Sequence, residues 1–286
     1  MANTKEIRGK ISSIQSTQKI TRAMEMVAAS KMRKSQHRVL ASRPYLSRIQ
    51  EVISHLIKGK LEYTHPYLVA RDVKKVAFLV ISTDRGLCGG LNINLFKNVF
   101  GEMRQFDQKA IPSVICTIGK RAETFFVHHK ADVAASVTAI GDIPKVKDLV
   151  GIMKVVTDAF DKLEVDEVYL CYNKFVSTLV QKPQIVRLLP VVDPKNEGAR
   201  AAWDYIYEPD AATLLDILLH RYVESLIYQA AVENAACEQA ARMMAMRNAS
   251  DNAEELISDL RLIYNKARQA AITKELAEIV AGAAAV

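Results

Sequence analysis

The first 58 residues carry apolar side chains at helical spacing. They contain one glycine, Gly9, and one proline, Pro44. Apolar positions recur three or four residues apart, which places them on one face of a helix. The positions are Ile7, Ile11, Ile14, Ile20, Met24, Val27, Leu46, Ile49, Ile53 and Leu56. The step from Ile14 to Ile20 predicts a stutter, and Pro44 predicts a kink or a fresh helix start near Ser42.

A longer helical pattern fills the end of the chain. After Pro209, which suits an early helical position, no glycine or proline occurs until Gly282. A helix of about 70 residues would be on the order of 100 Å long. No single globular domain encloses such a helix, so it must either break or project as a coiled coil. Its expected seam consists of Leu256, Leu260, Ile263, Ala267 and Ala270.

Between these patterns, short apolar runs alternate with helical stretches. The run Lys75–Ile81 is apolar almost throughout, as expected for a strand buried on both faces. Further strands are expected at 114–118, 133–139, 167–172 and 184–190, and helices at 94–106, 120–129 and 146–163. Strands that alternate with helices predict a mainly parallel, doubly wound sheet.

The pattern as a whole predicts an α/β fold in which a Rossmann-like, doubly wound domain is inserted between two long helices. Because the chain leaves along one helix and returns along the other, the helices should form an antiparallel coiled coil. The expected domains are the N-terminal coiled-coil helix at 1–60, the α/β domain at 61–204 and the C-terminal coiled-coil helix at 205–286. An alanine-rich stretch at 230–245 would permit a close approach of the helices.

Charge is distributed unevenly, although the net charge of the 286-residue chain is only +7. Residues 1–60 hold 13 Lys and Arg against 3 Asp and Glu, whereas residues 201–286 hold 7 against 13. A basic segment often binds nucleic acid or anionic lipid, but the acidic end of the same chain offers a nearer partner. The low aromatic content, 7%, favours helix-on-helix packing through small side chains.

The four cysteines, Cys88, Cys116, Cys171 and Cys237, form no CxxC pair and have no histidine at metal-ligand spacing. We therefore expect buried or inert thiols and no metal site. No apolar run approaches the ~18 residues needed to span a bilayer. The N-terminus starts with charged, helix-forming sequence rather than a signal peptide. These features favour a soluble protein of a cytoplasm-like space.

The glycine-rich turn Ser82–Asn92 follows the first strand directly, where a dinucleotide-binding loop would lie. Its spacing is not GxGxxG, no acidic residue ends the second strand, and the chain has no GxxxxGK[ST] motif. A structural turn is therefore favoured over a nucleotide site, and no cofactor is expected. His128 and His129 are adjacent and point apart on a helix, which disfavours a shared metal. The sequence contains no recognisable catalytic constellation.

Two groups of charged residues are interpreted without a catalytic role. Asp142 and Asp148 are interpreted as helix caps. The basic run Lys31, Arg33 and Lys34 is either a solvated helix face or a contact surface for acidic loops of a surrounding protein.

Three segments resemble the gamma subunits of F-type ATP synthases, and the resemblance covers essentially the whole chain in order. They are ITRAMEMVAASKMRK at 20–34, the turn STDRGLCGGLN at 82–92 and ITKELAEIVAGA at 272–283. Ser250 stands where many members have threonine, a conservative departure. The chain lacks the cysteine-bearing insertion of chloroplast forms, so thiol control of rotation is not expected.

The resemblance implies a central-stalk rotor subunit, one per complex, with no catalytic site of its own. Its coiled coil would rise through the ring of alternating alpha and beta subunits. Its α/β domain would stand on the membrane-embedded c-ring, with the epsilon subunit as a further partner. Proton flow would turn the c-ring and, through this shaft, drive the catalytic beta subunits. The chain would then be peripheral to the membrane, on the cytoplasmic face of the inner cell membrane.

The resemblance also implies contact residues. Met24 on the first helix, and Arg242, Gln269, Thr273 and Glu275 on the last helix, would meet a loop of a beta subunit.

A second implied contact precedes the last helix. Tyr205, Tyr207 and Glu208 would form a pad of rings and a carboxylate against the c-ring. The alternative for these three residues is a hydrophobic staple and N-cap of the helix.

Two other classes of function stay open at this point. A coiled-coil scaffold or nucleic-acid-binding protein would use the basic end, with a steep dependence on salt. A nucleotide-linked oxidoreductase would use the α/β domain, and cofactor binding by the isolated chain would support it.

Overall fold

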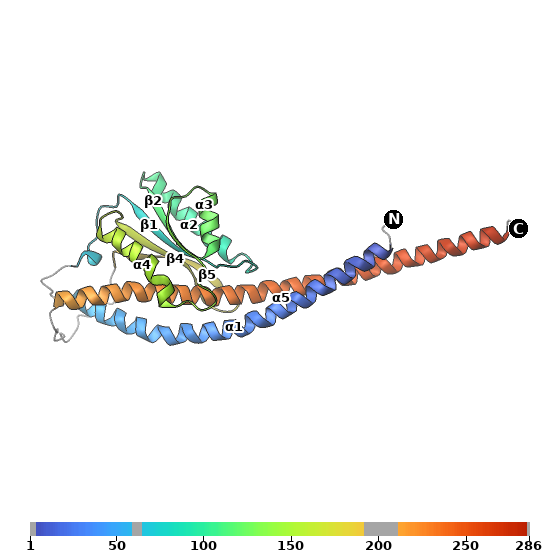
Figure 1. Cartoon of the computed structure of the whole chain (residues 1–286), viewed down its shortest axis with the longest axis horizontal. Coiled ribbons are helices and arrows are strands. Elements are labelled where there is room, and N and C mark those ends of the chain that lie inside the picture. Colours follow the sequence, from blue (N-terminus) through green and yellow to red (C-terminus); the bar gives the residue numbers. More distant parts are fainter. Residues whose placement is uncertain (1–3, 59–64, 192–210, 285–286) are drawn as a thin grey trace. The chain divides into compact units, whose positions relative to one another are not determined.

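The computed structural model describes residues 4–58, 65–191 and 211–284. Its elements follow the predicted order of a long helix, an α/β region and a second long helix (Figure 1). They are α1 (Thr4–Lys58), η1 (Pro66–Leu68), β1 (Val76–Ile81), α2 (Leu91–Gln108), β2 (Ser113–Ile118), α3 (Lys120–His128), β3 (Val133–Val137), α4 (Val146–Asp161), β4 (Glu167–Phe175), β5 (Gln181–Leu189) and α5 (Ala211–Ala284).

The strands form a single sheet in the order β3-β2-β1-β4-β5. β1 pairs in parallel with β2 on one side and with β4 on the other, and β3 extends the β2 side in parallel. The chain therefore starts in the centre of the sheet and winds outward in both directions, which confirms the predicted doubly wound fold. All six residues of β1 are buried, as their continuous apolar run predicted.

Alternating side chains of β1 supply two separate cores, because successive strand residues face opposite sides of a sheet. Val76, Phe78 and Val80 pack against α2 and α3, with Leu95 and Phe126. The residues between them, Ala77, Leu79 and Ile81, face α4 and parts of α1 and α5, with Phe160, Ile53 and Leu219. The long helices thus supply part of the core on one face of the sheet.

Strand β5 is the antiparallel edge of the sheet. It pairs with β4 from Gln181 opposite Phe175 to Leu189 opposite Val168. A short turn joins the two strands, in which the Ser177 N–H donates to the carbonyl of Val180 at 3.0 Å. This hairpin explains why the sheet is only mainly parallel.

The two long helices run without interruption over 55 and 74 residues. Pro44 lies inside α1, so the predicted fresh start of the helix is wrong. Proline removes the hydrogen bond to the carbonyl four residues earlier, which here belongs to Leu40. Both Leu40 and Pro44 are exposed, so that carbonyl faces water, while Val39 and Ile49 hold the helix on its buried side.

The chain divides into two compact units by packing. One consists of residues 1–29 with 242–286, hereafter the stalk unit, and the other of residues 30–241, hereafter the α/β unit. In the α/β unit, Ser42 of α1 contacts Gln229 of α5, and Val39 packs with Val232 and Ala236. In the stalk unit, Thr21 of α1 contacts Ser250 of α5 at 2.7 Å. Numbers rise along one helix as they fall along the other, so the predicted antiparallel pairing is confirmed.

The buried stripe of α1 shows that the predicted stutter is wrong. Ile20 and Val27 are exposed, and the stripe continues through polar residues at steps of four and three. The stripe consists of Ile7, Ile11, Ile14, Gln18, Thr21, Glu25, Ala28, Met32, Ser35, Val39, Ser42, Leu46, Ile49, Ile53 and Leu56. Such spacing keeps one seam facing the partner helix.

The seam of α5 in the stalk unit also differs from the prediction. Leu256, Ile263 and Ala270 are exposed, while Leu260 and Ala267 do lie half-buried on the seam. The seam consists of Met246, Ser250, Ala253, Ile257, Leu260, Tyr264 and Ala267. The prediction followed the bulkiest residues, whereas small Ser250 and Ala253 fit the close approach to α1.

Candidate functional site

The polar groups of the β1–α2 turn are used to hold neighbouring loops. The Asp84 Oδ1 accepts hydrogen bonds from the backbone N–H of Lys120 at 3.0 Å and of Ala139 at 3.1 Å, which follow β2 and β3. The Asn92 side-chain amide donates to Thr83 Oγ1 at 2.7 Å. Gly119 is required beside the turn, because a Cβ there would lie 2.6 Å from the Ser82 carbonyl oxygen. The turn is therefore a structural junction, as its sequence predicted.

Helix α5 packs over the carboxyl ends of β1 and β4, where the strand order reverses. In open α/β sheets this switch point is the usual ligand crevice. Here Cys237 of α5 packs against Cys88 and Leu91 of the turn, with Phe175 from the end of β4 beside them.

Two hydrogen bonds fasten α5 to β4 at the same place. The Asn173 side-chain amide donates to Asn234 Oδ1 at 3.0 Å, and the Cys237 thiol donates to the Asn173 carbonyl at 3.2 Å. A neighbouring cavity between the β1 and β2 ends and α5 measures only about 30 Å³. A nucleotide has no room in this crevice, because the chain's own helix fills it.

The four cysteines are free and buried, as the sequence predicted. Burial raises the pKa of the Cys116 thiol to about 11. It raises the pKa of Cys171 and of Cys237 further above the usual range. Because the thiolate is the nucleophile and the metal ligand, the thiols of Cys116, Cys171 and Cys237 are chemically inert at neutral pH.

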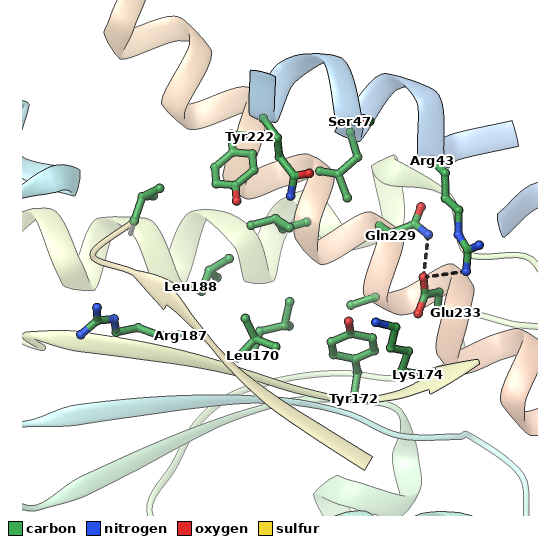
Figure 2. A pocket seen from close by; sticks show the side chains of 16 residues that line it. Arg43, Ser47, Leu170, Tyr172, Lys174, Arg187, Leu188, Tyr222, Gln229 and Glu233 are labelled. Carbon is green, nitrogen blue, oxygen red and sulfur yellow. Dashed lines mark hydrogen bonds and ion pairs between the residues drawn. The ribbon is translucent and has the colours of Figure 1, made fainter. Parts of the chain in front are cut away.

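A groove of about 700 Å³ lies between α1, α5 and the β4–β5 hairpin (Figure 2). Its charged centre is Glu233, whose Oε1 accepts from the Gln229 amide at 2.9 Å and lies 3.8 Å from Arg43 Nη2. Burial, and then the Glu233 carboxylate, raise the pKa of Tyr172 to about 12. Lys174 also lines the groove. This arrangement joins the two helices to the sheet.

Asp142 is bound to both long helices, so its interpretation as a helix cap is wrong. Its Oδ2 pairs with Lys31 Nζ of α1 at 2.7 Å, and its Oδ1 accepts from the Gln239 amide of α5 at 3.2 Å. The N-cap of α4 is Lys145, which makes no side-chain capping bond, and Asp148 lies in the first turn of that helix.

The basic run of α1 therefore has two parts. Lys31 is engaged within the chain by Asp142. Arg33 and Lys34 are exposed. The predicted contact face is available at these two residues.

The end of α5 is exposed from Arg268 to Ala283. Four large apolar side chains on it face solvent, namely Ile272, Leu276, Ile279 and Val280. No described residue of this stretch is buried, although the stretch continues a helix that is packed from Leu215 to Ala267. The candidate functional site consists of this exposed end and of the α5 seam that precedes it in the chain, from Met246 to Ala267.

The contact residues expected on the two long helices differ in how far they are exposed. Gln269, Thr273 and Glu275 lie on the exposed end of α5, where the Thr273 hydroxyl donates to the Gln269 carbonyl at 2.9 Å. Met24 is half-buried on α1. Arg242 is buried and has partners within the chain, and its expected contact with a beta subunit stays a prediction.

Other expectations fall outside what the structure describes. Tyr205, Tyr207 and Glu208 lie outside the described residues.

Over the described ranges, no cluster of three or more His, Cys, Asp or Glu side chains could hold a metal ion. Over the same ranges, no helix has an apolar stretch long enough to cross a bilayer.

Sequence reasoning missed Asp142 and the polar seam residues Gln18, Thr21, Ser35 and Ser42. The seam had a detectable signal, because the four residues continue the three-and-four spacing of Ile7, Ile11 and Ile14. The signal appears only when small polar residues are admitted to the pattern. Nothing in the sequence indicates the role of Asp142, because its partners lie far away in the chain.

Comparison with known proteins identifies close relatives. The family model described as ATP synthase matches residues 3–286. The ATP synthase gamma chains of Nitrosococcus oceani and of Glaesserella parasuis serovar 5 are each 56% identical to this chain over 288 aligned positions, with 100% of both chains covered.

Solved structures have the same fold. The Tetrahymena thermophila mitochondrial ATP synthase central stalk and c-ring structure contains a chain with 26% identity and a TM-score of 0.61, covering 81% of this chain and 99% of that one. The rotor of the Euglena gracilis mitochondrial ATP synthase contains a chain with a TM-score of 0.67 at 17% identity, covering 94% of this chain and 98% of that one. The second likeness is one of fold alone.

Proposed function

The chain belongs to the ATP synthase gamma chain family, and from this premise we propose that it is the rotating shaft of a proton-translocating ATP synthase, with no catalytic site of its own. Its α/β unit receives torque, and its paired helices deliver that torque to catalytic sites on other chains.

The exposed apolar end of α5 is the observation that carries this proposal. Large apolar side chains that face water together mark an interaction surface, and Ile272, Leu276, Ile279 and Val280 are all exposed. A surrounding sleeve of alpha and beta subunits would bury these side chains.

The filled switch point supports the absence of catalysis in this chain. The α/β domain offers one crevice typical of nucleotide sites, and Cys237, Asn234 and their partners occupy it. A nucleotide-linked oxidoreductase would need that space, so this alternative is disfavoured. The proposed shaft needs no cofactor or metal.

Stator contacts are proposed at exposed polar positions. Gln269, Thr273 and Glu275 lie on the same exposed helix end as the apolar residues and can hydrogen-bond to a loop of a beta subunit. Arg33 and Lys34 offer positive charge to acidic loops on the same ring. Met24, half-buried beside the seam of α1, would take part at the exposed edge of that seam.

The opposite end of the shaft is proposed to meet the c-ring and the epsilon subunit. Tyr205, Tyr207 and Glu208, which precede α5, are the proposed c-ring contacts, by resemblance alone. In this arrangement the chain is peripheral to the cytoplasmic face of the inner cell membrane, with one copy in each complex.

The test is to weaken the exposed helix end in the assembled enzyme. Replacing Ile272, Leu276 and Ile279 together by serine should loosen binding of the chain to an alpha–beta ring and lower ATP-driven proton pumping by membrane vesicles. Val155→Ser, at an exposed apolar position on α4, is the matched control. Unchanged ring binding and pumping by the triple variant would refute the assignment of this surface.

A further inference from the structure

The loop between β3 and α4 binds both long helices through one carboxylate. Asp142 lies in this loop, and its two oxygens take different partners. Oδ2 pairs with Lys31 Nζ of α1 at 2.7 Å, and Oδ1 accepts from Gln239 Nε2 of α5 at 3.2 Å. A single side chain of the sheet domain therefore ties α1 to α5.

The bridge formed by Asp142 lies at the limits of the α/β unit. Lys31 and Gln239 lie within two residues of Ser30 and Ala241, the limits of the α/β unit. Beyond those limits the same two helices continue into the stalk unit. The bridge thus lies at the last turn of each helix that belongs to the α/β unit.

The two helices are attached to the sheet domain differently near this point. α5 is held to β4 by Asn234 and Cys237, through their bonds to Asn173. α1 packs there on α5 through apolar contacts of Val39 with Val232 and Ala236, while its polar contacts, Ser42 with Gln229 and Arg43 with Glu233, lie farther from the limits of the unit. Apolar contacts are non-directional, so they resist separation of the helices better than they resist sliding or rotation of one helix against the other.

We propose that Asp142 is a torsional brace, a positioning residue that makes α1 turn together with α5 when the α/β unit is rotated. This inference rests on the proposed function as a shaft. Gln239 is 1% exposed, so its amide is fixed and holds Asp142 in place. Asp142 in turn holds Lys31, which transfers the constraint to α1.

The energetics suit a role in coupling rather than in folding. Lys31 and Asp142 side chains are 39% and 42% exposed, and an ion pair at such exposure contributes little to stability. Loss of the bridge should therefore leave the fold intact. Without the bridge, one polar contact fewer would oppose rotation of α1 against α5, at the point where torque leaves the α/β unit.

The experiment compares variants of the whole chain in the reconstituted enzyme. Asp142→Ala should lower proton pumping per ATP hydrolysed by about two- to fivefold, while ATP hydrolysis and the thermal midpoint of the free chain stay close to wild type. Arg48→Gln, which breaks a pair between neighbouring turns of α1, is the control and should pump normally.

A charge swap separates the brace from a merely structural role. Lys31→Asp combined with Asp142→Lys restores the pair with reversed polarity, and the Gln239 amide can present its oxygen instead of its nitrogen. Pumping should recover in the double variant and be lost in either single variant.

Three results decide the matter. Normal pumping by Asp142→Ala overturns the brace. A fall in thermal midpoint that parallels the loss of pumping, without recovery in the charge swap, also overturns it. Failure of the wild-type chain to support pumping at all would instead refute the proposed function, and the two failures are therefore distinguishable.

Discussion

Helix α5 packs very differently in the α/β unit and in the stalk unit. Between Ala230 and Cys237 every residue is buried, because the helix has the sheet on one side and α1 on another. Between Met246 and Ala267 only a stripe of one residue every three or four positions is covered. Beyond Ala267 nothing in the described chain covers it.

The difference explains why one continuous helix can have several roles. Where several elements surround it, small residues are needed on all sides, which accounts for the alanine-rich composition of the α/β unit segment. Where α1 is the sole described partner, a narrow seam suffices. The same helix is therefore an integral part of a core at one end and a free shaft at the other.

The largest effect is expected from a cavity in the α/β unit. Leu219 is fully buried in the core that α5 shares with the sheet. Leu219→Ala should lower the free energy of unfolding by about 3 kcal/mol, because transfer and cavity costs add. Leu256→Ala, on the exposed side of the same helix, should cost less than about 0.5 kcal/mol. Chemical denaturation followed by circular dichroism measures both, and equal losses would contradict the contrast between the units.

A smaller effect is expected from high pH. Burial raises the pKa of the Cys116 thiol from an ordinary value of 9.0 to about 11 in the folded chain. The unfolded chain therefore loses this proton first, and the free energy of unfolding should fall as pH rises from about 9 to 11. By pH 11 the loss should be about 2 kcal/mol. Cys116→Ala should flatten this part of the pH profile, and an unchanged slope would show that other groups dominate.

The hydroxyl pair of the stalk seam should matter less. Thr21 and Ser250 are both buried and lie 2.7 Å apart. Ser250→Ala should destabilise the stalk pairing by about 1 kcal/mol, because the Thr21 hydroxyl loses its cross-helix partner. Hydrogen exchange should speed up at 4–29 and 242–267 and stay unchanged in the sheet. Faster exchange throughout the chain would show that the two units unfold together.

The smallest effect on the free chain is expected at the exposed end of α5. Leu276 is more than half exposed, so Leu276→Ser should change the free energy of unfolding by less than about 0.5 kcal/mol. The same change should weaken binding to an alpha–beta ring. A clear loss of stability in the free chain would mean that this end is packed in solution.

Local patterns in the sequence were enough to predict the order and type of the elements. Continuous apolar residues from Val76 to Ile81 identified the central strand, and the scarcity of glycine and proline identified the long helices. Alternation of strands and helices was enough for the doubly wound fold. These features are local, and each depends on residues that are close together in the chain.

Tertiary structure decided which side of each long helix is buried and which polar groups meet. Thr21 and Ser250 occupy the seam while Ile20 and Leu256 face solvent, because close helix approach selects small side chains over bulky ones. Asp142 meets Lys31 and Gln239 only because the fold brings a loop of the sheet domain against both helices. Hydrophobicity along the chain carries no information about such distant polar contacts, because their energy depends on geometry rather than on composition.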